Sequence, residues 1–210
     1  MLMAAIMLIA IMTVVLSQSP EQQSDIITRQ TSDSEINRLI DQATTLQMAV
    51  NQMLMNGEDP KTLYSSLSAL PPSAAGFETA PHALKIYHPM GGGVKYMAGT
   101  SDAADAVATG FNIIPNAIVL GVGPTDAVIG DILFTAKISS ADACGKINLK
   151  LSGAAAIPVM VNADFNTLFN AEAAIIVNNL NCANCVNITK TCVSNTTGDE
   201  WGFYLSLLPG

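Results

Sequence analysis

Charged residues are scarce in this sequence, and most of those present are acidic. Only 12% of the 210 residues are charged, and nine Lys and Arg stand against 17 Asp and Glu, which gives a net charge of -8. No run of Lys or Arg reverses that sign locally. Because proteins hold a phosphate backbone chiefly through clustered basic side chains, we expect no nucleic acid among the partners.

Aromatic residues and recognisable catalytic motifs are equally scarce. Phe, Trp and Tyr make up 5% of the chain, and no G-x-S-x-G is present. The two histidines, His82 and His88, lack a neighbouring acid pair or cysteine in the sequence, so we expect them at the surface or at the end of a hairpin. Residues 91–93 are three glycines without the Lys-Ser/Thr of a phosphate-binding loop. We therefore predict no enzyme, no cofactor and no metal site.

Hydrophobic residues, in contrast, are abundant. They make up 50% of the chain, and its mean hydropathy is +0.37, which excludes intrinsic disorder. Residues 1–16 contain no charge, and as a helix they would extend about 24 Å, against roughly 30 Å for the hydrocarbon core of a bilayer. We predict that residues 1–19 form a hydrophobic membrane or filament segment, with a lipid bilayer or other copies of the chain as its partner. Its apolar side chains include Met1, Ile6, Leu8, Ile11, Val14 and Leu16.

A secretory signal peptide is the alternative interpretation of this segment. Such a peptide normally begins with Lys or Arg, whereas the first basic residue here is Arg29. A cut after Ser17 would leave a mature chain beginning at Gln18, and the protein would then be a secreted or periplasmic binding module or enzyme. A helix buried in a soluble core is a further interpretation, although a chain of this length has little room to surround it.

Residues 20–57 are predicted to form an amphipathic helix. Pro20 suits a first turn or a kink, and Ser32 with Glu35 matches a capping box. Gly57 supplies a stop signal. The apolar residues recur every three or four positions: Ile36, Leu39, Ile40, Ala43, Leu46, Val50, Met53 and Leu54. This spacing places them on one face, which needs a partner layer.

Residues 58–210 are predicted to form a globular antiparallel α+β head. Connections too short for crossover helices favour antiparallel pairing. Ser140 is expected to cap a short helix on which Cys144, Ile147 and Leu151 share a face. The expected strands are residues 84–87 and 94–97, joined as a hairpin through 88–93, then 118–122, 132–138 and 201–208. The fold class expected is α+β, with a long N-terminal helix packed on a small antiparallel sheet.

Four cysteines are expected to form two disulfides in an exported domain. They are Cys144, Cys182, Cys185 and Cys192, and four cysteines allow three pairings. We favour Cys144 with Cys182 and Cys185 with Cys192. The C-x-x-C of residues 182–185 also suits zinc or redox chemistry, but a zinc ribbon needs a second close pair and a thioredoxin-like site needs a strand-to-helix junction in a βαβ unit. The sequence indicates neither.

The order of these segments resembles type IV pilins and the pseudopilins of type II secretion. In that family a peptidase removes a short leader, the new N-terminus is methylated, and an apolar half-helix first anchors the subunit in the inner membrane and later packs in a filament core. Residues 1–16 would be that half-helix, Pro20 the helix-distorting proline, and residues 141–208 the disulfide-bounded C-terminal region. The family's Gly-Phe junction and the glutamate after it are not in this sequence; a start upstream of Met1 would account for that.

The resemblance implies a non-enzymatic structural subunit. It would be a single-pass inner-membrane protein with a periplasmic head, or part of an extracellular filament built from copies or related pilin-like subunits. An uncharged helix suits both settings, because lipid and a bundle of sister helices are of similar polarity.

Overall fold

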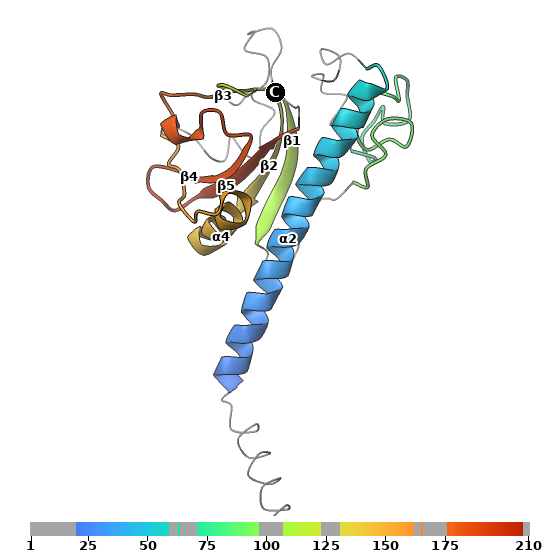
Figure 1. The fold of residues 1–210 in the computed structure, drawn as a ribbon. Helices are drawn as coiled ribbons and strands as arrows, with labels where there is room; N and C mark the ends of the chain where they lie inside the picture. The colour runs from blue at the N-terminus through green and yellow to red at the C-terminus, as the bar shows by residue number, and fades with distance from the viewer. Residues whose placement is uncertain are drawn as a thin grey trace, which may run out of the picture.

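The computed structural model describes residues 20–58, 63, 71–96, 107–122, 131–161, 165 and 176–207. These residues form an α+β fold in which a long helix packs on a mixed sheet, as Figure 1 shows. The elements in chain order are α2 (Pro20–Met55), β1 (Ala108–Val119), β2 (Asp131–Ile138), α4 (Ala141–Ser152), β3 (Ile176–Val177), the 3-10 turn η1 (Ala183–Cys185), β4 (Lys190–Ser194) and β5 (Trp201–Ser206). The predicted α+β class is confirmed.

Helix α2 ends where its sequence predicts. Gly57 adopts a φ of 97°, a left-handed conformation that glycine takes without steric cost. Its N–H donates to the Leu54 carbonyl at 3.0 Å, and the Glu58 N–H donates to the Met53 carbonyl at 3.2 Å. These two bonds make a Schellman motif, which satisfies carbonyls that the helix end leaves without partners.

The capping box predicted at Ser32 and Glu35 is not used. Helix α2 runs through both residues without a break, so no helix begins there. The Glu35 carboxylate instead accepts a hydrogen bond from the Val107 N–H at 2.8 Å. A side chain that could have capped its own helix therefore joins α2 to the start of β1.

The predicted apolar face of α2 is buried in the core. Ile36, Leu39, Ala43, Leu46, Val50 and Met53 are each at most 2% exposed. Ile40 and Leu54 are partly buried against the same cluster. In Figure 1 the C-terminal half of α2 lies alongside β1, while the N-terminal part projects past the sheet.

The sheet is mixed, which corrects the expectation of a wholly antiparallel one. Its strand order is β3-β1-β2-β5-β4. Three pairings are antiparallel, but β3 runs parallel to β1, with Ile118 opposite Ile176. The chain between these two strands passes through β2 and α4, and this long connection lets β3 return in the same direction as β1.

Strand β1 begins ten residues before the predicted 118–122 segment and ends at Val119. Its pairing with β2 shifts register between Thr109 and Asn112 and again between Ile114 and Ala117. Pro115 lies in the second irregularity, where a residue without an N–H is tolerated. Proline and two asparagines weakened the strand signal in the sequence. The predicted strands at 132–138 and 201–208 match β2 and β5, apart from their terminal residues.

The hairpin predicted at residues 84–97 is wrong as far as Tyr96, the last residue described there. The segment consists of turns, held by bonds from the Gly92 N–H to the Lys85 carbonyl and from the Val94 N–H to the Ile86 carbonyl. A Cβ atom on Gly91 would lie 2.2 Å from the Lys85 carbonyl oxygen. This close approach of two backbone stretches is open only to glycine, and it replaces a strand ladder.

Two apolar clusters lie on the two faces of the sheet. Residues of β2 and β5 alternate between them, as a pleated strand requires. Phe134 and Phe203 join the cluster under α2 and α4, whereas Leu133 and Tyr204 join a second cluster with residues of the 160–185 region. Among the described residues, helices cover one face of the sheet, and side chains between Met160 and Cys185 pack on the other.

Candidate functional site

The predicted membrane or filament residues from Met1 to Leu16 lie outside the described residues. Pro20 is the first residue of α2, a position where its missing N–H is not needed. Within the part of the chain that the structure describes, no helix combines the length and apolarity needed to cross a bilayer.

Two other segments of the chain hold α2 where it leaves the head, at residues 33–37, and we call this part of the helix the neck. On one side Lys150, in the last turn of α4, donates to the Asn37 side-chain oxygen at 2.7 Å and to the Asp33 carbonyl at 3.5 Å. On the other side the Glu35 carboxylate accepts the Val107 N–H. Ile36, which is 0% exposed, follows at once. The neck therefore fixes the direction in which the helix leaves the head.

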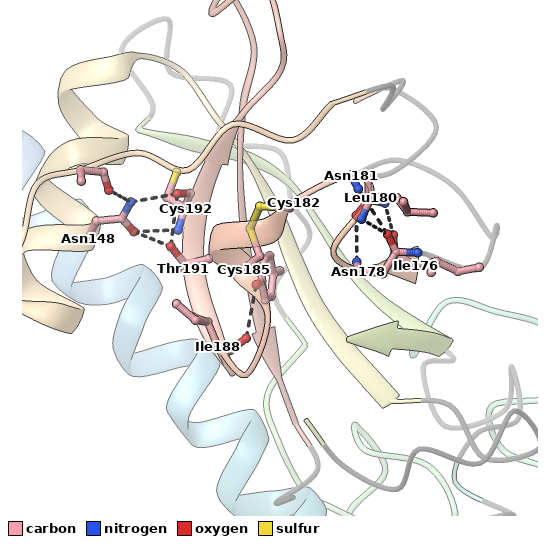
Figure 2. The surroundings of a disulfide bond; sticks show 12 residues. Asn148, Ile176, Asn178, Leu180, Asn181, Cys182, Cys185, Ile188, Thr191 and Cys192 are labelled. Carbon is pink, nitrogen blue, oxygen red and sulfur yellow. Dashed lines mark hydrogen bonds between the residues drawn. A yellow bond between two sulfur atoms is a disulfide. The ribbon is translucent and has the colours of Figure 1, made fainter. Parts of the chain in front are cut away.

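The disulfides pair differently from the prediction. Cys144 of α4 bonds to Cys192 of β4, and Cys182 bonds to Cys185, with Cα–Cα distances of 5.4 and 5.2 Å. The first joins helix to sheet over 48 residues, and the second closes a turn of three. Figure 2 shows the Cys182–Cys185 bond, with Cys192 nearby.

The predicted pairing fails because the sheet separates the partners. Cys144 and Cys192 belong to the cluster under the helices, whereas Cys182 and Cys185 belong to the cluster on the opposite face. All four are at most 1% exposed. Among the described residues no group of three or more His, Cys, Asp or Glu is placed to hold a metal ion.

Asn148 supports the Cys144–Cys192 disulfide. It lies one helical turn after Cys144, and its Oδ1 accepts the Cys192 N–H at 2.8 Å and the Thr191 hydroxyl at 3.1 Å. Its Nδ2 donates to the Cys192 carbonyl at 2.8 Å and the Ala156 carbonyl at 2.9 Å. Every donor and acceptor of the amide is thereby used. The sequence carried a signal, since Asn148 is a polar residue close to the predicted apolar face of Cys144 and Leu151.

A groove of about 280 Å³ lies beside this amide, between α4 with the chain that follows it and the 184–191 segment. Asn148 contributes to its lining, and Lys190 is its only charged residue. The apolar side chains that line it are Leu151, Ala154, Ala156, Ile157, Pro158 and Ile188. Because the Asn148 amide is already saturated, the groove offers mainly apolar contact.

The turn at residues 178–181 projects a single apolar side chain. The Asn178 side-chain oxygen accepts the N–H groups of Leu180 and Asn181, at 2.8 and 3.2 Å. The Asn181 side chain in turn accepts the Asn178 N–H at 2.8 Å and donates to the Ile176 carbonyl. Leu180 at the tip is 88% exposed, the largest exposure among the described large hydrophobic residues.

The histidines are not both at the surface, which corrects the expectation for His88. His88 is 7% exposed; its Nδ1 accepts the Met90 N–H at 3.1 Å, and its Nε2 lies 3.7 Å from the Glu78 carboxylate. The His82 ring stacks on it with a centroid distance of 4.3 Å. The pair orders the 76–90 turns.

Lys85 is a buried cation that the sequence analysis missed. Its ammonium group donates to the carbonyls of Gly76 and Phe77, both at 2.6 Å, and to that of Thr79. The whole residue is 0% exposed, and the ammonium lies 5.9 Å from the centroid of the Phe77 ring. A lysine within the apolar run Leu84 to Tyr87 was the available signal. Its role is to hold the 76–79 turn on the core.

Asp131 is a buried acid at the start of β2. It is 3% exposed, and its Oδ2 accepts the Val119 N–H at 2.7 Å, while its Oδ1 has no hydrogen-bond partner. Burial raises the pKa of this carboxyl from 3.8 to about 6, against the lowering effect of the Val119 N–H. Among the described residues Asp131 has no titratable neighbour. We therefore interpret it as a structural residue that accepts the N–H of Val119 at the end of β1.

Comparison with known proteins does not assign the chain to a family: no family model, no curated protein and no solved structure matches it.

Proposed function

We propose that this chain is a non-enzymatic structural subunit of the pilin or pseudopilin kind. Residues 1–19 would anchor it in the inner membrane and then pack against other copies in a filament, with the head outermost. The observation that carries the proposal is the projection of α2: Pro20 to Ser32 precede the neck and extend about 20 Å past it as continuous helix. A stem of this kind holds a head away from a surface.

The neck supports a mechanical role for that stem. Because Lys150 and the Val107 N–H both hold α2 at the neck, and six apolar residues bury its C-terminal half, force applied to the stem would be carried directly into the head. The Cys144–Cys192 disulfide joins α4, the helix that carries Lys150, to β4. A subunit joined to its neighbours through a helix needs this kind of firm attachment between helix and head.

The distribution of polar groups supports a structural role over catalysis. Lys85, His88 and Asp131 are buried, and each makes hydrogen bonds that hold a turn or a strand end. The groove beside Asn148 is lined mainly by apolar and amide side chains.

The anchor can be tested with a single charge. We expect the full chain to fractionate with membranes and to need detergent for extraction. A Leu8→Arg variant places a charge in the apolar segment, which costs about 2.5–3.5 kcal/mol at a helix centre in a bilayer, and should shift the protein to the soluble fraction. Gln18→Arg, next to the segment's end, is the matched control and should stay with the membrane.

Two results would overturn the proposal. The first is a full chain that is monomeric and soluble without detergent. The second is a mature protein whose N-terminal sequence begins at Gln18, because the segment would then be a cleaved signal. Electron microscopy of extracts from producing cells provides the positive result, since filaments should be seen with the unmodified chain and not with the Leu8→Arg variant.

A further inference from the structure

The Leu180 turn and the groove lie in the same part of the head but cannot meet within one molecule. The Cys182 N–H donates to the Asn178 carbonyl at 2.8 Å, and the Ile188 N–H donates to the Cys185 carbonyl at 3.1 Å. The Cys182–Cys185 disulfide therefore fastens the Leu180 turn on one side and a wall of the groove on the other. Figure 2 shows Ile188 and Asn148 on one side of this disulfide and Leu180 on the other.

The two features match as a projection and a recess. Four side-chain hydrogen bonds from Asn178 and Asn181 hold the turn, so little conformational freedom remains to be lost when Leu180 is buried. A groove of about 280 Å³ with apolar walls has room for a leucine side chain and its neighbours. Isolated apolar side chains at a protein surface are ordinary, but one held rigidly at the tip of a turn is typical of an interface anchor.

A second copy of this chain carries both the projection and the recess, and charge does not oppose their contact. The net charge of -8 makes copies repel one another over most of their surface. Residues 176–189 contain no Asp, Glu, Lys, Arg or His, and the groove residues include no acid and one base, Lys190. A neutral turn meeting a neutral to weakly basic groove is a contact that two such acidic molecules can make without opposing like charges.

We infer that the Leu180 turn of one copy inserts into the groove of the next copy. The surface that inserts, the Leu180 turn, differs from the surface that receives it, the groove, so the contact is heterologous. Repeated contacts of this kind form open strings unless the rotation between copies closes a ring. The inference rests on the proposed function, to which it adds the contact between heads. The amide side chain of Asn179, exposed beside Leu180, would meet the exposed Lys190 at the groove rim.

The test uses the full chain with a photo-crosslinking amino acid at position 180, assembled in membranes or filaments. Irradiation should give dimers and higher multiples, and mass spectrometry should map the crosslinks to peptides containing Ile157 or Ile188. The same group at Met90, 71% exposed on a different turn, is the control and should not crosslink to those peptides. Crosslinks elsewhere, or none, in filaments that still form would overturn the inference and leave the proposed function standing. Absence of any assembly would overturn both.

A substitution at the same position gives a second measurement. Leu180→Asp should weaken association between copies about tenfold or more, while Leu180→Met should retain it. The unfolding midpoint in urea should be unchanged in both variants, because Leu180 is exposed in the monomer. Unchanged association in Leu180→Asp would overturn the inference.

Discussion

The side chain of Asn148 pairs with the backbone of Cys192 as a neighbouring strand would. It donates to the Cys192 carbonyl and accepts the Cys192 N–H, both at 2.8 Å. Farther along β4, the Ser194 N–H donates to the Pro158 carbonyl, and the Ser194 carbonyl accepts the Met160 N–H. The outer edge of β4 is therefore covered over these residues, which prevents pairing with other edges.

Removing this amide should destabilise the head. Asn148→Ala leaves the buried N–H and carbonyl of Cys192, and the partly exposed carbonyl of Ala156, without their present partners. We expect the free energy of unfolding in urea to fall by about 2–4 kcal/mol. The control is Asn179→Ala at an exposed position, which should change it by no more than about 0.5 kcal/mol. Equal effects of the two substitutions would show that the Asn148 bonds contribute nothing.

The two disulfides should differ in their contribution to stability. In the loop-entropy description, closing 48 residues contributes about 4 kcal/mol and closing three contributes about 2 kcal/mol. Cys144→Ala/Cys192→Ala should therefore lower the free energy of unfolding more than Cys182→Ala/Cys185→Ala. Both variants remove two buried sulfurs, so the packing losses are matched. A larger loss in the Cys182 and Cys185 variant would contradict this assignment.

Asp131 should make stability fall as the pH rises. Its pKa is raised to about 6 in the folded state, so the native state holds the proton more tightly than the unfolded state does. The stabilisation by the protonated acid is fully present below about pH 4 and is lost as the pH rises through 6. Asp131→Asn stays neutral, so its stability relative to the unmodified chain should increase by roughly 1–3 kcal/mol between pH 4 and pH 7.

Asp199 provides a control of opposite sign. Hydrogen bonds from the Thr197 hydroxyl and then from the Asn195 amide lower the pKa of this exposed carboxyl. The ionised Asp199 carboxylate stabilises the folded state above the ordinary pKa of the group. This stabilisation is lost as the pH falls through the lowered pKa of the folded state. Asp199→Asn should therefore lose stability relative to the unmodified chain as the pH rises. Urea midpoints measured across pH 3–8 test both variants, and parallel curves for the two would contradict the assignment.

Lys85 should hold the 71–96 turns in place. Lys85→Met removes the donor to three backbone carbonyls, and we expect a loss of about 2–4 kcal/mol. Hydrogen exchange should accelerate in residues 71–96 more than in β5. Lys95→Met, on an exposed side chain of the same segment, is the control and should leave exchange unchanged. Unaltered exchange in Lys85→Met would show that the buried ammonium does not order these turns.

Several features that depend on neighbours in the sequence were predicted correctly, although the capping box at Ser32 and Glu35 and the hairpin at residues 84–97 were not. Ser140 caps α4 by accepting the Ala143 N–H at 3.2 Å, and Gly153 ends the helix with a φ of 78°. The apolar spacing in residues 36–54 defined the buried face of α2. Such features follow from backbone geometry and from the 3.6-residue period, both of which act over a few residues.

Features that depend on distant segments were missed. Cys182 cannot pair with Cys144 because the sheet lies between them. The partner of Glu35 is Val107, 72 residues away in the sequence. The parallel direction of β3 and the burial of Lys85 likewise follow from where other segments pack. No local pattern encodes them, because each is the outcome of competition among many possible contacts for the same space.

The sequence alone determined an acidic, hydrophobic chain with an uncharged first segment, an amphipathic helix with a defined end and a helix capped by Ser140. Only the tertiary structure decided which cysteines meet, where α2 leaves the head, and that a rigid Leu180 turn and an apolar groove lie on two sides of one disulfide. The physical reason is one of range: propensity and periodicity act along the chain, whereas pairing across a sheet depends on how its two faces are covered.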